Sequence, residues 1–123
     1  MNCYKRITRP TACLLALLLT IAPSAFAHAH PKTMTPAPDS AGPPPSKISI
    51  TFSEAVEPKF SSIKLTDTAG KSVDSETSAP VPGDPATITL KVPSLGRGAY
   101  VVHWTNVSVD GHHLEGSYKF TVR

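Results

Sequence analysis

Short segments in which polar and apolar residues alternate with a period of two run along the chain from residue 47 to its end. Such alternation is typical of a β-strand with one buried and one exposed face. We expect strands at 47–52, 62–66, 87–92, 99–104 (followed by the apolar-polar run 106–109) and 116–123. No segment has the 3.6-residue period of a convincing amphipathic helix, so the pattern predicts an all-β protein.

Proline, glycine and serine separate these segments. Residues 31–46 contain six prolines, which exclude a helix and favour an extended path with turns. Residues 71–85 are polar and contain proline, and we expect a long loop there with a short strand at 71–74. Without an internal repeat or a second domain, these short strands predict one small antiparallel β-sandwich of immunoglobulin-like type. Its expected core consists of Ile48, Ile50, Phe52, Ile63, Leu65, Ile88, Leu90, Tyr100, Val102, Trp104, Tyr118, Phe120 and Val122.

Residues 1–27 have the parts of a cleaved secretory signal peptide. A basic region containing Lys5 precedes an apolar run at 14–22, and Ala25-Phe26-Ala27 is a small-x-small cleavage signal. The apolar run is shorter than the roughly 20 residues that cross a bilayer core. We therefore expect residues 28–123 to be exported as a mature domain that is not embedded in a membrane.

Removal of residues 1–27 changes the charge of the chain and its supply of metal ligands. The net charge of +3 comes from 12 basic and 9 acidic residues, and three of the basic residues lie in the signal segment. The mature chain is therefore formally neutral, and we expect no nucleic-acid partner. Both cysteines, Cys3 and Cys13, are lost as well. Any metal site must then use nitrogen and oxygen donors, with at most one thioether from Met34.

Cleavage after Ala27 makes His28 the first residue of the mature chain. Its free amine, with a pKa of about 7.7 to 8, and its imidazole can bind one metal ion together. In an extended or gently turned segment, residues two apart project to the same side, so Asp110 and His112 can converge on one point. These groups make a set of four nitrogen and oxygen donors that suits Cu(II) better than Zn(II) or Cu(I).

His30 provides an alternative mode of binding. A free N-terminus with histidine in third place can wrap Cu(II) or Ni(II) with the amine, two deprotonated backbone amides and the imidazole, without Asp110 or His112. The cleavage position is also open, because Ala27-His28-Ala29 is a second small-x-small triplet that would leave His30 first. Pro31 would then block the wrapped mode, because proline has no N–H to lose.

Other residues of this region have simpler interpretations. Asp110-Gly111 is a common turn dipeptide, which is compatible with a ligand role for the aspartate. The side chain of His113 should point away from that of His112, and His103 alternates out of phase with its apolar neighbours, which places it on the surface. The glycosylation sequon at Asn106 should be accidental.

The mature chain resembles the CopC family of periplasmic copper-binding proteins. The resemblance rests on His28-Ala29-His30-Pro31-Lys32, Thr35-Pro36-Ala37, Phe52-Ser53-Glu54, Gly98-Ala99-Tyr100 with Val102 and Trp104, and Val107-Ser108-Val109-Asp110-Gly111-His112. It implies an immunoglobulin-like or cupredoxin-like sandwich, a Greek-key barrel, over residues 28–123, with cleavage before His28. It also implies a Cu(II) site in which His28 (through amine and imidazole), Asp110 and His112 are the ligands. Glu54 is implied to orient the free amine.

The resemblance further implies a role without catalysis. The mature protein would sequester or carry Cu(II) in the periplasm for copper resistance or homeostasis, and would hand it to an inner-membrane copper transporter of the CopD type. Some members of the family also bind Cu(I) in a loop rich in methionine and histidine. Residues 66–85 contain neither, so we expect a carrier of Cu(II) only.

Two other classes of function use the same features. Copper-dependent polysaccharide monooxygenases also bind copper through an N-terminal histidine and a second imidazole on a sandwich fold. Here Asp110 would occupy coordination space that oxygen activation needs, and the small domain leaves little surface for a flat polymer. The third class is a structural β-sandwich without metal, in which the histidines are coincidental.

Overall fold

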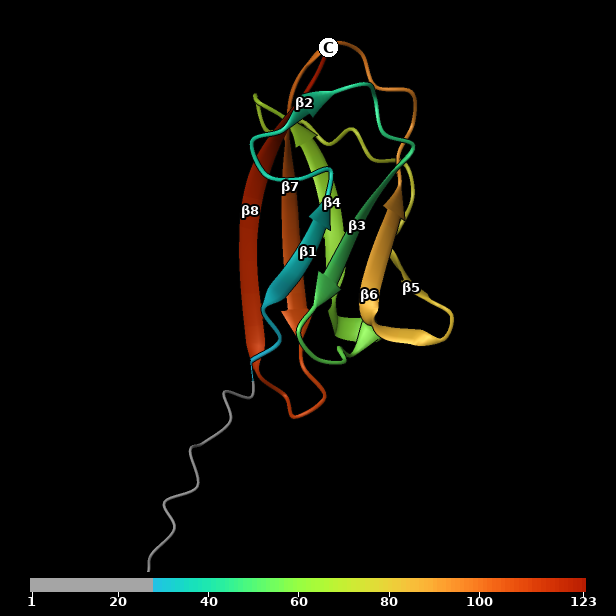
Figure 1. Ribbon diagram of the computed structural model, residues 1–123, viewed down its shortest axis with the longest axis vertical. Coiled ribbons are helices and arrows are strands. Elements are labelled where there is room, and N and C mark those ends of the chain that lie inside the picture. The colour runs from blue at the N-terminus through green and yellow to red at the C-terminus, as the bar shows by residue number, and fades with distance from the viewer. Residues whose placement is uncertain (1–27) are drawn as a thin grey trace, which may run out of the picture.

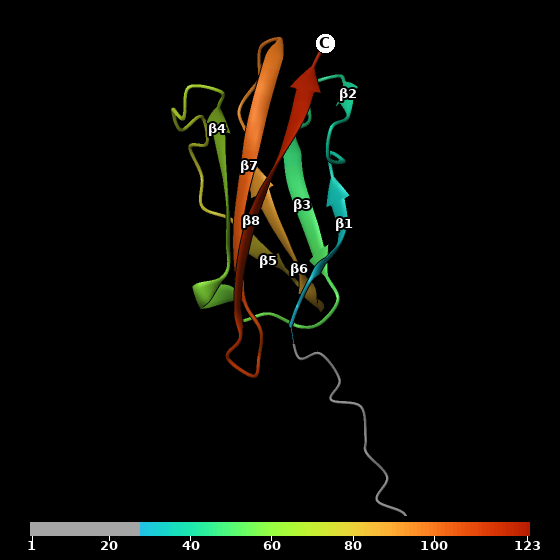
Figure 2. The ribbon, with the colours of Figure 1, turned by 90° about the vertical axis from the view of Figure 1, so that its left-hand side faces the viewer.

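Two four-stranded β-sheets packed face to face form residues 28–123, the part of the chain that the computed structural model describes (Figures 1 and 2). The elements are β1 (Pro31–Thr35), β2 (Ala41–Gly42), β3 (Lys47–Phe52), the 3-10 turn η1 (Pro58–Phe60), β4 (Ser62–Asp67), β5 (Ala79–Val81), β6 (Asp84–Lys91), β7 (Gly98–Val107) and β8 (His113–Val122). Within this range no helix has the length and apolar character needed to cross a membrane. The predicted signal peptide, residues 1–27, lies outside the described residues.

The two sheets form an open sandwich. One has the strand order β1-β3-β6-β5 and is antiparallel; the other has the order β2-β8-β7-β4, in which β2 runs parallel to β8. Closure into a barrel requires hydrogen-bonded strands all the way round. Each sheet instead ends in its own edge strands, and Figure 2 shows two separate layers. The all-β sandwich expected from the sequence is confirmed, whereas the expected barrel form is wrong.

The alternating segments supply the core between the sheets. Ten of the predicted core residues are buried: Ile48, Ile50, Phe52, Ile63, Leu65, Ile88, Leu90, Val102, Phe120 and Val122. The three other predicted members, Tyr100, Trp104 and Tyr118, are partly buried and pack against them. Because full burial of one large apolar side chain contributes about 1.5–3 kcal/mol, this layer stabilises residues 28–123, which contain no cysteine.

The strands differ from the sequence prediction where proline is present. Residues 71–74 form only an isolated bridge between Thr66 and Ser72, while the strand of this region is β5, which includes Pro80. β5 is an edge strand, where a residue without an N–H costs no ladder hydrogen bond. β1 likewise begins with Pro31 at the edge of its sheet.

The topology brings two distant parts of the chain to one end of the sandwich. The start of β1 and the loop between β7 and β8 lie at the same end in both views (Figures 1 and 2). The residues that follow β3 are also there, because Ser53 N donates a hydrogen bond to His30 O at 2.8 Å. This end therefore collects the segments that carry the predicted ligands.

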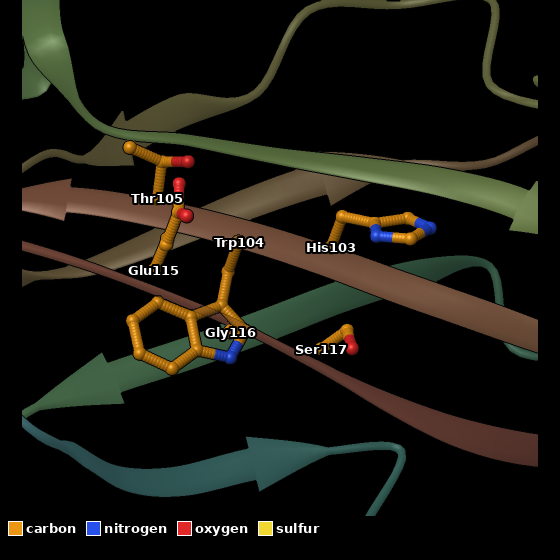
Figure 3. A pocket seen from close by; sticks show the side chains of 6 residues that line it. All are labelled: His103, Trp104, Thr105, Glu115, Gly116 and Ser117. Atoms are coloured by element: carbon orange, nitrogen blue, oxygen red, sulfur yellow. The ribbon is translucent and has the colours of Figure 1, made fainter.

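Trp104 depends on a glycine of the neighbouring strand. The two residues are partners in the β7–β8 register, and a Cβ atom on Gly116 would lie 2.6 Å from Trp104 Cζ2. Figure 3 shows the indole beside Gly116. The indole also contacts the core, because its ring centroid lies 5.7 Å from that of Phe52 in a T-shaped arrangement. The absence of a side chain on Gly116 thus lets the indole pack across β8.

We expect Gly116→Ala to lower the free energy of unfolding by about 1–3 kcal/mol, since the added methyl group overpacks the site. Urea unfolding followed by the fluorescence of Trp104, the single tryptophan of the sequence, measures this. Gly96→Ala is the control, because nothing lies within 4 Å of a Cβ there. Equal unfolding midpoints for wild type and Gly116→Ala would contradict the packing argument.

Candidate metal site

The residues that lead into β1, His28-Ala29-His30, are held against the sandwich from two sides, and we call them the N-terminal arm. Ala29 is completely buried, and its carbonyl accepts a hydrogen bond of 2.6 Å from Nδ2 of Asn106 on β7. On the other side, Ser53 Oγ accepts from His30 N at 3.0 Å. The arm is therefore a fixed part of the fold, so the position of His28 is determined by the sandwich.

The loop between β7 and β8 is a tight turn. Gly111 N donates to Ser108 O at 2.8 Å, and Ser108 N donates to His112 O at 2.9 Å. Gly111 has a φ of 90°, a conformation that favours glycine. The turn that Asp110-Gly111 predicts is therefore present, and it holds Asp110 and His112 on one side of the loop.

The fold brings the three predicted ligands together. The ring centroids of His28 and His112 lie 4.6 Å apart, and His112 Nδ1 lies 3.0 Å from Asp110 Oδ2. The ring of His30 is 6.1 Å from that of His28, further away than the ring of His112.

One nitrogen of His28 is left open by the protein. Its Nδ1 atom is buried and has no hydrogen-bond partner within residues 28–123. A buried polar atom without a partner is unfavourable, and a metal ion would satisfy it. Nδ1 is also the ring nitrogen nearer to the backbone, so it can close a chelate ring with the amine of the same residue. The residues present therefore suit a metal ion bound through the first histidine.

The ligands are gathered but not arranged around an ion. Among the described residues, no group of three His, Cys, Asp or Glu side chains has the spacing that holds a metal. The Asp110 carboxylate instead accepts one hydrogen bond from Ser108 Oγ and contacts His112 Nδ1. The amine of His28 also becomes a free donor only when the preceding peptide bond is cut. Binding of a metal ion by the predicted ligands would therefore require cleavage before His28 and the exchange of the Asp110–His112 contact for bonds to the ion.

The carboxyl group of Asp110 is more acidic than a free aspartate side chain. The hydrogen bond from Ser108 Oγ, and next that from His112, lower its pKa from 3.8 to about 2. Because the carboxylate is the favoured form, the contribution of these contacts to stability is present above pH 3.8 and is lost as the pH falls through about 2. At neutral pH the group is thus a charged oxygen donor on the surface.

We expect Ser108→Ala to raise the pKa of Asp110 towards 3.8, because it removes the larger of the two causes. NMR titration of the side-chain carboxyl carbon in the metal-free protein measures the midpoint. Ser53→Ala leaves the carboxylate contacts in place and should leave the midpoint unchanged. If Ser108→Ala also titrated near pH 2, the assignment of the shift to this hydroxyl would be wrong.

The remaining candidates lie away from these contacts. Glu54 is exposed beyond the end of β3, and in the described part of the chain its side chain has no hydrogen bond or ion pair; its role toward the amine remains a prediction. His113 is exposed at the start of β8. The predicted surface position of His103 is confirmed: it is exposed, and its Nε2 lies 3.0 Å from Thr66 Oγ1.

A hollow on the sandwich does not include the predicted ligands. Its volume is about 400 Å³, and it is lined by His103, Trp104, Thr105, Glu115, Gly116 and Ser117 (Figure 3). It lies on the half of the β7–β8 pair nearer the connecting loop, whereas Asp110 and His112 lie in the loop itself.

Asn106 and Ser53 are residues of this end whose roles the sequence analysis missed. Asn106 is completely buried, which agrees with the expectation that its glycosylation sequon is accidental. A signal for its role exists, because it continues the buried alternation of Val102 and Trp104 along β7, where a polar residue needs an internal partner. No comparable pattern in the sequence indicates the hydrogen bond between Ser53 and the arm.

The fold and this site together define a class of protein: a small open β-sandwich with two histidines and an aspartate at one end. Residues 31–123 match the model of the CopC domain, and the chain belongs to the CopC family. This confirms the family resemblance on which the ligand expectations depend.

The chain is similar to named members of this family. Copper resistance protein C of Escherichia coli is 41% identical over 115 residues, which cover 87% of this chain and 90% of that protein. The crystal structure of PcoC, a methionine-rich copper resistance protein from Escherichia coli, superposes with a TM-score of 0.72 at 38% identity, and covers 79% of this chain and 100% of the other. The longer copper transport protein CutJ of Bacillus subtilis is 30% identical over 111 residues, which are 89% of this chain and 20% of CutJ.

Proposed function

We propose that the mature protein, residues 28–123, is a periplasmic carrier of Cu(II) in copper resistance or homeostasis. The observation that carries the proposal is the open Nδ1 of His28, buried beside the ring of His112 and near Asp110. Membership of the CopC family supports copper as the cargo, because similar proteins are named for copper resistance.

The site consists of the amine and Nδ1 of His28, a carboxylate oxygen of Asp110 and an imidazole nitrogen of His112. Three nitrogens and one anionic oxygen form a tetragonal donor set that favours Cu(II). Cleavage before His28 supplies the amine, and Glu54 orients it as a hydrogen-bond acceptor. Export thus precedes formation of the site.

Cu(I) is not a cargo of this site. Met34, the one methionine of the mature chain, is partly buried against the core from β1, and alone it cannot supply the several soft ligands that Cu(I) prefers. Residues 66–85 contain no methionine or histidine. The similar PcoC is described as methionine-rich, so the two chains differ in the soft ligands that Cu(I) prefers.

The carrier hands its ion to an inner-membrane copper transporter of the CopD type. About half of the His112 and Asp110 side-chain surface is exposed, 48% and 42%, so ligands of a partner can reach the ion. The similar segment in the longer copper transport protein CutJ supports a pairing of this domain with transport. The role is non-catalytic: the similar proteins are named for copper resistance and transport.

We expect His28→Ala, Asp110→Ala and His112→Ala to weaken Cu(II) binding by the mature protein, the histidine variants by more than about 100-fold, because each removes a ligand and second-layer partners alone change affinity 10–100-fold. Competition titration against a Cu(II) chelator measures this. His113→Ala is the control and should bind like wild type.

The same titration separates the alternative mode. If His30→Ala abolished binding while Asp110→Ala and His112→Ala left it unchanged, the copper would be wrapped by the N-terminal amides and this site would be wrong. Binding that none of the variants affects would favour a protein without a specific copper site.

A mature protein with one extra residue before His28 should lose most of its affinity, because the amine is moved away from the ion and replaced by an amide nitrogen. The same competition titration and a Cu(II) EPR spectrum measure the loss. The variant keeps every side chain of the site. If it folds and still loses affinity, the loss comes from the amine and not from a missing side chain. Normal binding would show that the amine of His28 is not a ligand.

A further inference from the structure

Asn106 links the core to the N-terminal arm in an unusual way. It is completely buried on β7, and its Nδ2 donates a hydrogen bond of 2.6 Å to Ala29 O, 77 residues away in the sequence. Its Oδ1 atom is also buried and has no hydrogen-bond partner within residues 28–123. Only one end of the amide is used by the structure, and that end is bound to the arm.

Core stability alone does not account for an asparagine at this position. A buried acceptor without a partner is unfavourable, and a β-branched apolar residue fits the buried face of a strand better. The feature that an apolar residue cannot supply is the bond to Ala29.

This bond holds one particular peptide group. Ala29 O and His30 N belong to the same peptide unit, so Asn106 binds its carbonyl while Ser53 Oγ accepts from its N–H at 3.0 Å. Both polar atoms of the Ala29–His30 peptide are thereby occupied. We call this arrangement the peptide clamp.

The clamped nitrogen is one that the competing copper chelate requires. In the wrapped mode, the ion is bound by the amine of His28, the amide nitrogens of Ala29 and His30, and the imidazole of His30. His30 N would have to lose its proton and leave Ser53, and the completely buried Ala29 would have to leave the core. The clamp instead keeps His28 beside His112.

We propose that Asn106 is a positioning residue that selects the mode of copper coordination. By holding the Ala29–His30 peptide, it presents His28 to Asp110 and His112 and excludes the wrapped chelate of His28-Ala29-His30. The inference rests on the proposed copper site, and it adds the residue that chooses between two modes which the sequence alone permits.

The test compares Asn106→Val with Tyr118→Phe in the mature protein. Both remove a buried oxygen that has no partner in the described residues, but only Asn106→Val removes the bond to the arm. We expect metal-free Tyr118→Phe to melt at or above the temperature of the wild type, and Asn106→Val to melt lower, because it leaves the buried Ala29 carbonyl without its donor. With one equivalent of Cu(II), Asn106→Val should show a visible absorption band at shorter wavelength and an EPR spectrum of four nitrogen donors, whereas Tyr118→Phe should match the wild type.

Second substitutions identify the ligands in each background. His112→Ala should change the affinity of Asn106→Val less than about threefold, and His30→Ala should become the damaging substitution, since the two modes use different ligands. If Asn106→Val kept the spectrum of the wild type and its dependence on His112, the selecting role of Asn106 would be refuted. If the wild type itself depended on His30 and not on His112, the proposed site would fail, and the two failures are therefore distinguishable.

Ser53→Ala provides a second variant should Asn106→Val fail to fold. Ser53 is exposed, so the fold tolerates its truncation, yet the change removes the other half of the peptide clamp. We expect a mixture of the two EPR spectra whose wrapped component increases with pH, because amide deprotonation releases protons. A single wild-type spectrum at every pH would count against the clamp.

Discussion

The hydrogen bond from Asn106 to Ala29 holds the first residues of the domain in place, and the position of His28 beside His112 depends on it. A chain terminus is usually the least ordered part of a domain unless it is tied down. Here the buried Ala29 and the bond to its carbonyl make the arm continuous with β1 and with the core. A flexible terminus could approach Asp110 and His112 only by losing conformational freedom at the moment of binding. In this protein the loss occurs during folding.

The loop of the β7–β8 hairpin contributes the other part of the proposed site, and different interactions hold it in place. Its loop is fixed by its own hydrogen bonds, with glycine at the one position of positive φ, and it does not depend on contacts with the arm. The two halves meet because β1 and β8 belong to opposite sheets whose ends coincide (Figure 1). The sandwich is thus the element that converts a distant pair of motifs into neighbours.

Much of this could be predicted from the sequence. The alternating segments around Ile50, Leu65 and Val102 indicated strands and core, because period two is a local property of the chain. The proximity of His28 to Asp110 and His112 followed from the family resemblance, since no local pattern specifies a contact over such a separation. The open edges of the sheets were missed because barrel closure is decided by strand pairing and not by alternation.

The polar contacts could not be predicted from the sequence either. A serine such as Ser53 has many possible partners, and only the folded backbone shows that it binds His30. The strand β5 was missed because Pro80 counts against a strand unless the position is known to be an edge.

The contact between Asp110 and His112 has a consequence for how copper would enter and leave the proposed site. In the metal-free protein the two side chains hold each other in place, on a loop whose backbone is already closed. At the proposed site, exchange of this contact for bonds to an ion would need only rotations of the half-exposed Asp110 and His112 side chains, and rotations of exposed side chains take picoseconds to nanoseconds. If the proposed site is right, the loop backbone would not have to change when an ion enters or leaves.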